Sequence, residues 1–160
     1  MTVADFWAQA RATTPGLPVD PPSGEPWGFG ATPEHADALL ALVLAGIKTG
    51  TSSYVWEYEA DNEPLPQAGQ YDVILDGSGQ PAAILRTVSV EVVPFNLVSA
   101  EHAHAEGEDD RTLESWRRIH RRFYEQHVNL GRQFAEDMPI ACERFELVHP
   151  TGLDSAGRIR

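Results

Sequence analysis

The chain has 160 residues, of which 42% are hydrophobic and 22% charged, so it is expected to form one globular domain and not a disordered protein. Its net charge of −12 disfavours binding to duplex nucleic acid, although a local basic surface would still hold a short strand or a nucleotide. The single cysteine, Cys142, excludes an intrachain disulfide framework and a multi-cysteine zinc cluster.

No secretory signal and no apolar run long enough to cross a membrane is found in the sequence, so we expect a cytoplasmic protein without a membrane partner. The first twelve residues predict a short amphipathic helix with Phe6 and Trp7 on its apolar side. Thr13–Gly30 is rich in proline and glycine, which is typical of an arm that wraps around a domain.

A helix is predicted to begin after Thr32, because this residue is a suitable N-cap and Pro33 suits the first helical position. An apolar face follows, and Gly46 ends the helix. The β-branched and aromatic residues of Thr51–Tyr58 then predict a strand. Lys48 therefore lies on a helix-to-strand connection, where side chains are held by rigid elements and stay accessible.

The rest of the chain alternates between strands and helices. Its expected elements are a hairpin of Tyr71–Leu75 and Ala82–Val93, a short helix over Ala100–Ala105 capped by Ser99, an acidic loop over Gly107–Arg111, a helix from Thr112 to His127, a strand over Met138–Val148 and a loose tail over Thr151–Arg160. This order predicts an α+β fold, with a small barrel or highly curved sheet flanked by helices.

The segment Gly46–Ser53, with the sequence GIKTGTSS, contains the only lysine of the chain, Lys48, among several hydroxyl groups. It is not a phosphate-binding P-loop, because the lysine follows a helix instead of opening one. Two interpretations remain. Lys48 either caps the end of a helix, or it activates the hydroxyl of Thr51, provided that both side chains turn into one pocket.

A second segment, HAHAEGEDD, combines histidines and carboxylates. On a helix His102 and Glu106 would share a face at a spacing of i, i+4, which suits a divalent ion or a carboxylate placed beside Lys48. An established metal-ligand spacing is absent, so we predict no metal site. Asp109 and Asp110 are interpreted as a solvated loop that precedes the next helix.

In the helix that follows, Trp116, Phe123 and Tyr124 fit the core better than a platform for stacked bases. The arginines of the same helix would either contact phosphates or pair with the neighbouring acidic residues. The sequence leaves these two alternatives open.

The segment GIKTGTSS resembles the Gly-x-Lys-x-x-Thr signature of ASCH domains, and HAHAEGEDDRTLESWRRIH resembles a later segment of the larger bacterial members. The resemblance runs from about Phe29 to His149 and includes WEYE at Trp56–Glu59 and the hairpin LDGSGQPAAIL. It implies a small PUA-like β-barrel with flanking helices. On this basis we expect an N-terminal helix and arm over residues 1–28, the ASCH domain over 29–149 and a flexible tail over 150–160.

The resemblance also implies a chemistry. Small bacterial ASCH proteins are amidohydrolases that act on N4-acetylcytidine with a lysine, a threonine and a later glutamate, which correspond here to Lys48, Thr51 and Glu106. Thr51 would be the nucleophile, Lys48 would activate its hydroxyl, and Glu106 would orient the lysine or move protons. A larger bacterial member is instead described as a ribonuclease on single-stranded RNA.

One departure concerns substrate binding, because the small amidohydrolases have an arginine where this chain has Ser53, and Arg111 is a candidate replacement. The further substrate-binding candidates are Tyr54, Trp56, Glu57 and Glu108. We expect a nucleoside or short single-stranded RNA as partner, no duplex DNA and no cofactor, with a divalent metal left open for a ribonuclease. The alternative to an enzyme is a module that binds RNA or a modified base, with Tyr54 or Trp56 stacking on it.

Overall fold

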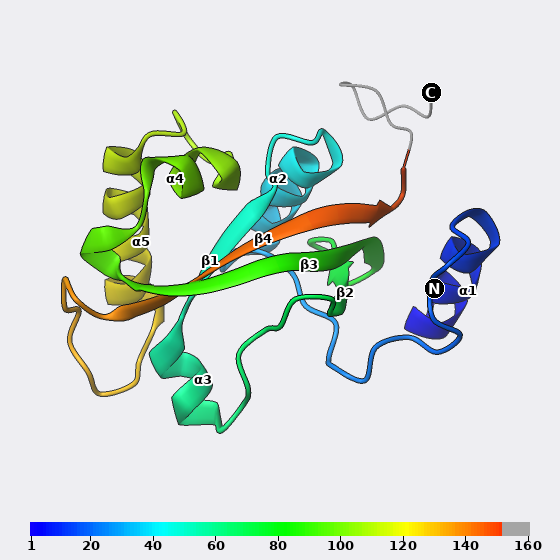
Figure 1. Ribbon diagram of the computed structural model, residues 1–160, viewed down its shortest axis with the longest axis horizontal. Helices are drawn as coiled ribbons and strands as arrows, with labels where there is room; N and C mark the ends of the chain where they lie inside the picture. Colours follow the sequence, from blue (N-terminus) through cyan, green and yellow to red (C-terminus); the bar gives the residue numbers. More distant parts are fainter. Residues whose placement is uncertain (152–160) are drawn as a thin grey trace.

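The computed structural model describes residues 1–151, and the tail predicted over 150–160 falls outside the described residues except for Pro150 and Thr151. Its elements are α1 (Val3–Thr13), α2 (Pro33–Leu44), β1 (Gly50–Tyr54), α3 (Val55–Asp61), β2 (Tyr71–Leu75), β3 (Pro81–Pro94), the short 3-10 helix η1 (Phe95–Leu97), α4 (Ala100–Glu106), α5 (Leu113–His127) and β4 (Pro139–His149) (Figure 1). Among the described residues, no helix has both the length and the apolar character needed to cross a membrane.

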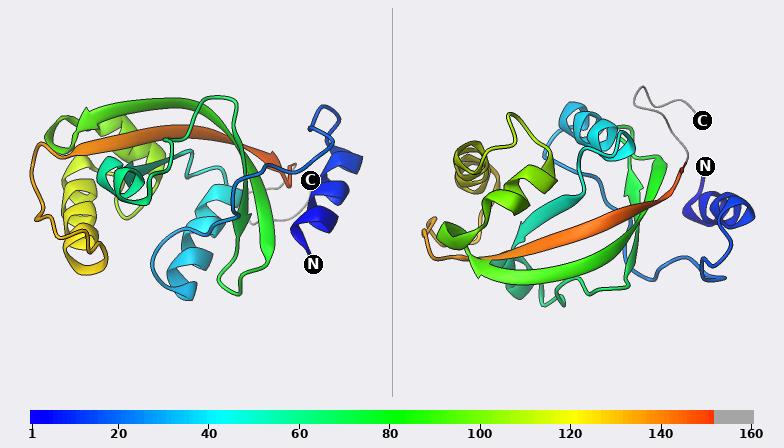
Figure 2. Two further views of the ribbon diagram at one scale, coloured as in Figure 1. Left: turned by 90° about the horizontal axis from the view of Figure 1, so that it is seen from below. Right: turned by 45° about the horizontal axis from the view of Figure 1, so that its top comes forward.

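The four strands form one antiparallel sheet in the order β1-β4-β3-β2. The long strands β3 and β4 bend along their length, so the sheet curls into half a barrel with the helices around it (Figure 2). Register shifts in β3 interrupt its pairing with β4 between Ile84 and Leu85 and between Thr87 and Ser89, and such bulges increase the bend of a strand. The predicted α+β fold, a highly curved sheet flanked by helices, is confirmed.

The helix starts agree with the predictions. Thr32, Ser99 and Thr112 each accept a hydrogen bond from the backbone N–H three residues later, at the first turns of α2, α4 and α5. Each of these bonds satisfies a backbone donor that has no partner inside its helix. The expected helix at the N-terminus is also present, as α1.

The prediction of a strand over Thr51–Tyr58 is wrong in its second half. β1 ends at Tyr54, and α3 follows without a loop. The strand-forming aromatic residues of this half pack as a helix instead, with Trp56 against Tyr124 of α5 at 6.2 Å between ring centroids. Asn62 ends the helix in a left-handed conformation at φ 53°. Tertiary packing thus outweighs local strand propensity here.

The two faces of the sheet bear different elements. Ile140 and Cys142 of β4 contribute to a core cluster with Ala103 of α4 and Trp116 of α5, and we call this side the α4–α5 face. Phe145, on the alternate parity of the same strand, packs with α2, and we call the other side the α2 face. Helix α1 covers the far end of the α4–α5 face, where Phe6 and Trp7 pack near Val73 and Ile84.

Candidate functional site

Lys48 lies in the turn that links α2 to β1. Gly46 adopts a φ of +76°, and the backbone N–H groups of Ile47 and Lys48 both bond to the carbonyl of Leu42. This turn brings the Lys48 side chain into the protein, where the residue is 2% exposed. A lysine is rarely so deeply buried unless its ammonium is paired.

The Lys48 ammonium has three hydrogen-bond acceptors. Its Nζ lies 2.8 Å from the Gly50 carbonyl oxygen, 3.3 Å from the Glu106 carbonyl oxygen and 3.2 Å from Oε2 of Glu108. The Glu106 carboxylate adds an ion pair at 3.8 Å from its Oε1. All three donors of the ammonium are therefore engaged.

The Gly50 carbonyl places Lys48 at the free edge of the sheet. β1 has β4 as its single neighbour, and the preceding carbonyl, that of Thr49, accepts from Phe145 of β4. Successive carbonyls of a strand point in opposite directions, so the Gly50 carbonyl points away from β4. Lys48 thus caps the outer edge of β1, between the two faces, and its Nζ is 5.3 Å from the centroid of the Phe29 ring on the α2 side.

Glu106, the last residue of α4, is the centre of a buried polar cluster on the α4–α5 face. The residue is 1% exposed. Its Oε2 accepts hydrogen bonds from Ser52 Oγ at 2.9 Å and from the indole N–H of Trp116, and it lies 2.8 Å from Nε2 of His102. Its Oε1 lies 3.5 Å from Nε2 of His120. This carboxylate therefore has partners on α4, α5 and β1.

The tautomer of His102 follows from its second nitrogen. Nδ1 of His102 accepts a hydrogen bond from Nε of Arg144 at 3.3 Å, so the proton of a neutral ring is on Nε2, which faces Glu106. His120 stacks on Trp116, with ring centroids 4.2 Å apart, and its Nδ1 lies 2.8 Å from the carbonyl oxygen of that same residue. Two imidazoles are thus directed at one carboxylate.

The charges of the cluster stabilise one another. Burial alone would raise the pKa of Glu106, but His120, His102 and Lys48 hold it well below its usual range. Burial likewise disfavours the charged form of His120, yet the nearby Glu106 carboxylate outweighs this and raises the pKa of His120. The stable state of the cluster is therefore an ionised carboxylate between cations.

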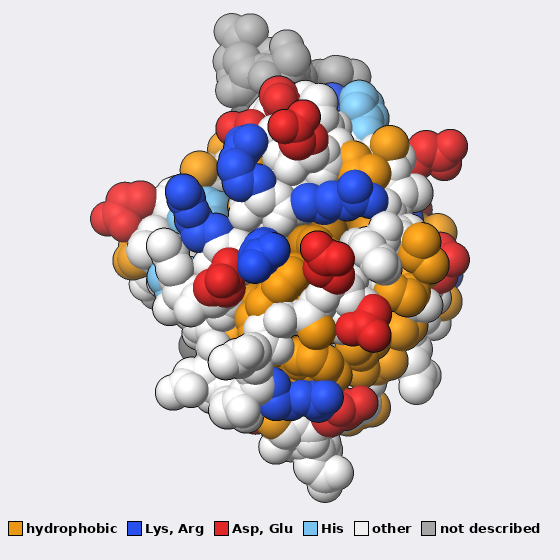
Figure 3. Space-filling view, turned by 90° about the vertical axis from the view of Figure 1, so that its left-hand side faces the viewer, with side chains coloured by type: hydrophobic (Ala, Val, Ile, Leu, Met, Phe, Trp, Pro, Cys, Tyr) orange, Lys and Arg blue, Asp and Glu red, His pale blue; other side chains and the backbone are white. Residues whose placement is uncertain are grey.

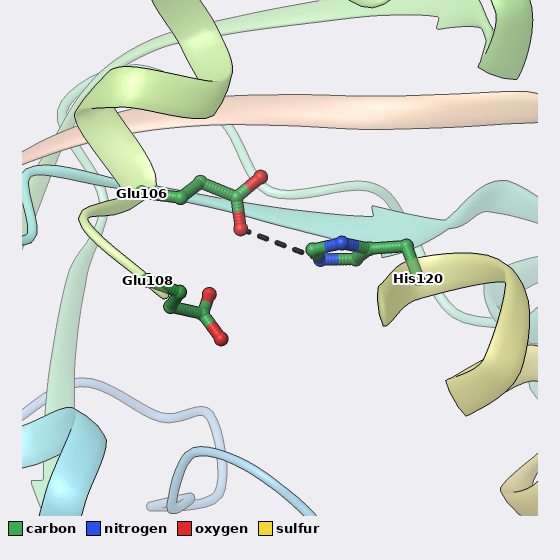
Figure 4. A group of neighbouring side chains, drawn as sticks. All are labelled: Glu106, Glu108 and His120. Atoms are coloured by element: carbon green, nitrogen blue, oxygen red, sulfur yellow. Dashed lines mark ion pairs between the residues drawn. The ribbon is translucent and has the colours of Figure 1, made fainter. Parts of the chain in front are cut away.

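Glu106, Glu108 and His120 are also the residues to consider for a metal ion. Each offers a ligand atom, and these atoms lie within 4.8 Å of one another (Figure 4). The Lys48 ammonium already occupies the space between the two carboxylates, 3.2 Å from Glu108 and 3.8 Å from Glu106. A divalent ion would have to displace this internal cation, so the donor set does not fit a metal in the observed arrangement.

Thr51 lies on the opposite face of β1 from Glu106. Side chains alternate along a strand, and Ser52 points to Glu106, so Thr51 and Ser53 point to the α2 face. There they line a cavity of about 1000 Å³. Of the three residues expected to share one cleft, the structure brings Lys48 and Glu106 together and does not bring Thr51 to Glu106.

The walls of this cavity come from four parts of the chain: the N-terminal helix and arm, β1 with its neighbour β4, helix α3, and the segment from Glu63 to Asp72. Six carboxylates are among the lining residues, namely Asp20, Glu25, Glu57, Glu63, Asp72 and Glu143. None of the lining residues in the described part of the chain is a lysine or an arginine. The cavity is therefore strongly acidic.

Glu143 of β4 is the most buried of the six carboxylates, at 7% exposed. It is paired in register with Thr51, and its Oε1 accepts a hydrogen bond from the Thr87 hydroxyl of β3. Burial raises the pKa of Glu143, the bond from Thr87 opposes this, and the negative charge of Asp72 adds to the rise.

The other predicted site residues fall into two groups. Ser53 and Glu57 line the cavity, and Glu108 holds Lys48. Tyr54, Trp56 and Arg111 are not among the residues that line it.

Each of these three residues is engaged elsewhere. Tyr54 is 5% exposed in the core and donates its hydroxyl to the His120 carbonyl oxygen at 2.6 Å. The ring of Trp56 is covered by the guanidinium of Arg132, at 3.6 Å from its centroid. Arg111 bonds the carbonyl oxygens of His104 and Ile47 and so ties the acidic loop to the Lys48 turn.

Sequence reasoning missed Trp116 and His120 as partners of Glu106, and Glu143 as a neighbour of Thr51. The sequence contained an indication of the first two, because they are four residues apart on one face of α5 and offer an indole N–H and an imidazole to the same partner. It contained no indication of Glu143, since its position in the cavity depends on the register between β1 and β4.

A second, smaller groove of about 330 Å³ lies between the start of α2 and helix α5. Its lining includes Arg118, Arg122, His35 and His127, and no acidic residue of the described chain is among the lining residues. Figure 3 shows arginine side chains gathered with acidic ones around an apolar surface at this end of the molecule, where α5 lies. Basic charge is therefore concentrated away from the cavity that contains Thr51.

Comparison with known proteins gives one family and related crystal structures. The family model described as "ASCH domain" matches residues 25–149. A crystal structure of a protein from Enterococcus faecalis V583 is 40% identical, with a TM-score of 0.80 over 92% of this chain and 90% of that one. The ASCH domain crystal structure from Lactobacillus crispatus JV V101 is 28% identical, with a TM-score of 0.80 over 91% and 93% of the two chains. No curated protein matches this sequence.

Proposed function

The chain belongs to the ASCH domain family, and from this premise we propose that it is a hydrolase that cleaves the amide bond of a small N-acylated nucleoside such as N4-acetylcytidine. The substrate would bind in the cavity beside Thr51. ASCH domains share the PUA-like fold associated with RNA binding, so a substrate that contains a nucleobase agrees with the family as well.

The observation that carries the proposal is the charge of the cavity. Its lining includes six carboxylates and, among the described residues, neither lysine nor arginine. An RNA strand has one negative charge per nucleotide and would be repelled by these walls, whereas an uncharged nucleoside would not. The carboxylate of Glu57 would also accept hydrogen bonds from the ribose hydroxyls of such a substrate.

Thr51 would supply the nucleophile, since its half-buried hydroxyl lies on the cavity wall. Its oxygen would attack the acyl carbon, the carbon–nitrogen bond would break, and cytidine would leave with the proton from the hydroxyl. Water would then hydrolyse the acyl-threonine ester to acetate and free threonine. Ser53 and Glu57, which line the same cavity, would bind the nucleoside.

Lys48 and Glu106 would act on Thr51 from the edge of the strand. The Lys48 ammonium holds the Gly50 carbonyl, which belongs to the peptide bond preceding Thr51. Glu106 in turn fixes the ammonium through its carbonyl oxygen at 3.3 Å and its carboxylate at 3.8 Å. We assign both residues the positioning of β1 and, with it, of the nucleophile.

The test is the release of cytidine from N4-acetylcytidine, followed by chromatography. Wild type should release cytidine, Thr51→Ala should be reduced to the background rate, and Thr51→Ser should keep measurable turnover because a hydroxyl is retained. Ser23→Ala is the matched control, since it removes an exposed hydroxyl from the same cavity. Equal turnover by wild type and Thr51→Ala would exclude the nucleophile, and no turnover by wild type would exclude this substrate.

Binding or cleavage of single-stranded RNA is a second candidate, favoured by the groove between α2 and α5. Its two arginines lie one helical turn apart and would contact phosphates. Under this hypothesis Arg118→Gln combined with Arg122→Gln should weaken RNA binding and flatten its salt dependence, while Arg86→Gln, on an exposed part of β3, should not. RNA binding that is unchanged in the double variant would remove this candidate.

A further inference from the structure

Thr51 and Glu143 are directly opposite each other on neighbouring strands. β1 and β4 pair without a register shift from Gly50 to Tyr54, so these two side chains project from the same face of the sheet. In an antiparallel pair, opposite Cβ atoms are about 4.5–5.5 Å apart, which is within reach of a hydrogen bond between a threonine hydroxyl and a glutamate carboxylate. Both residues line the acidic cavity.

Neither Lys48 nor Glu106 is free to take the proton of the Thr51 hydroxyl. The three donors of the Lys48 ammonium are directed at three acceptors, and among the described residues none of its contacts is to Thr51. Glu106 lies beyond the strand on the α4–α5 face, where its oxygens contact histidines, an indole and Ser52. A base for Thr51 must therefore be found on the cavity side.

Glu143 has the position and the environment of such a base. The Thr87 hydroxyl bonds its Oε1, which fixes the carboxylate and leaves Oε2 for a second partner. The titratable groups that face Glu143 are Asp72 of β2 and Tyr58 of α3, and neither is a cation. Burial and the charge of Asp72 raise the pKa of Glu143, so a proton that it accepts is held more firmly than by an exposed carboxylate.

We propose that Glu143 is the general base of the amide hydrolysis, which takes the proton of the Thr51 hydroxyl and passes it to the leaving nitrogen. The inference rests on the proposed function. As the bond from Thr51 Oγ1 to the acyl carbon forms, the Oγ1 proton moves to Glu143. As the carbon–nitrogen bond breaks, that proton moves to the amine of cytidine. Glu143 then removes a proton from water, which hydrolyses the ester, and returns it to Thr51.

The experiment compares Glu143→Gln with Glu63→Gln on N4-acetylcytidine. Both variants remove one carboxylate from the same cavity, but Glu63 is exposed and lies outside the sheet. We expect kcat of Glu143→Gln to fall by about 100- to 10,000-fold with little change in KM, as is typical for the loss of a general base. Glu63→Gln should keep the wild-type kcat. Glutamine retains an acceptor for Thr87, so the melting temperature should be nearly unchanged.

Two further readouts separate a base from a structural residue. In wild type, kcat/KM should fall as pH decreases through the raised pKa of Glu143, because the protonated carboxyl cannot accept the Thr51 proton, and this decrease should be absent from the residual activity of Glu143→Gln. Formate should restore activity to Glu143→Ala. Turnover by Glu143→Gln at the wild-type rate would overturn the inference while leaving the hydrolase intact. Absence of turnover in wild type would instead overturn the proposed function.

Discussion

His102 and Glu106, one turn apart on α4, face each other with 2.8 Å between the imidazole Nε2 and the carboxylate Oε2. His120 approaches the other oxygen of the same carboxylate, at 3.5 Å, from α5. The carboxylate thus connects the two helices that cover this face of the sheet, and its removal should affect both the stability of the protein and the protonation of its neighbours.

The first prediction concerns the charge of Glu106. Glu106→Gln should lower the free energy of unfolding by about 3–5 kcal/mol. The buried Lys48 ammonium would lose one of its two anionic partners, and the His120 imidazole would lose the carboxylate with which it pairs. Urea denaturation followed by tryptophan fluorescence measures this loss. The control is Glu114→Gln, which changes an exposed glutamate on the first turn of α5. A loss no greater than that of the control would contradict the account.

The second prediction concerns His120. In wild type its pKa is raised chiefly by the Glu106 carboxylate against the effect of burial, so in Glu106→Gln, where only Glu108 and the Trp116 carbonyl still oppose burial, the pKa should fall below its wild-type value. NMR titration of the His120 Cε1 proton measures both values. A pKa that stays raised in the variant would show that Glu106 is not the cause.

The pH dependence of stability follows from the same two shifts. The lowered pKa of Glu106 gives stability that is present above the ordinary value of 4.5 and is lost as pH falls through the lowered value. The raised pKa of His120 gives stability that is present below 6.5 and is lost as pH rises through the raised value. The difference in unfolding free energy between wild type and Glu106→Gln should therefore be largest between these ordinary values, and a difference that is constant with pH would refute the coupling.

A third prediction tests the cap on β1. Lys48→Met should cost about 3 kcal/mol, because Glu106 and Glu108 would lose their shared cation and the Gly50 carbonyl its donor. Hydrogen exchange should become faster at the amides of β1 than elsewhere in the sheet. Arg86→Met serves as the control, since its ion pair with Glu146 is solvent-exposed and contributes little. Unchanged exchange in β1 would mean that the strand is held by β4 alone.

A fourth prediction concerns the thiol of Cys142, which is 9% exposed on the α4–α5 face. Burial raises its pKa to about 12, with the charges of Glu106 and Glu91 adding to the effect. The thiolate, which is the reactive form, is therefore scarce at neutral pH. An aromatic disulfide reagent at pH 8 should react with the native protein far more slowly than with the protein in urea. Equal rates would place the thiol at the surface.

Local chemistry made much of the fold predictable. Thr32, Ser99 and Thr112 cap helices through bonds to residues only three positions away, so each start could be located from its own neighbourhood. The change from β1 to α3 after Tyr54 could not be located in this way, because it depends on packing against Tyr124, which lies far along the chain. Local sequence does not predict an element whose conformation depends on packing against a distant part of the chain.

The candidate site, too, could be predicted only in part from the sequence. The proximity of Lys48 and Glu106 agrees with the motif and with the helical spacing of His102 and Glu106. The face on which Thr51 lies, and its pairing with Glu143, are set by strand register. A shift of one residue would exchange the two faces, and no pattern within the motif records which register is adopted.

The lysine at the outer edge of β1 also has a consequence for behaviour at high concentration. An edge strand with unpaired backbone groups is a template on which another chain can add a strand, and repeated addition leads to aggregates. Here the Gly50 carbonyl, which points outward, is already bonded to a buried ammonium, and Glu106 and Glu108 surround that position. An incoming strand would find this acceptor occupied, so the same lysine that orders the edge also hinders strand addition at this position.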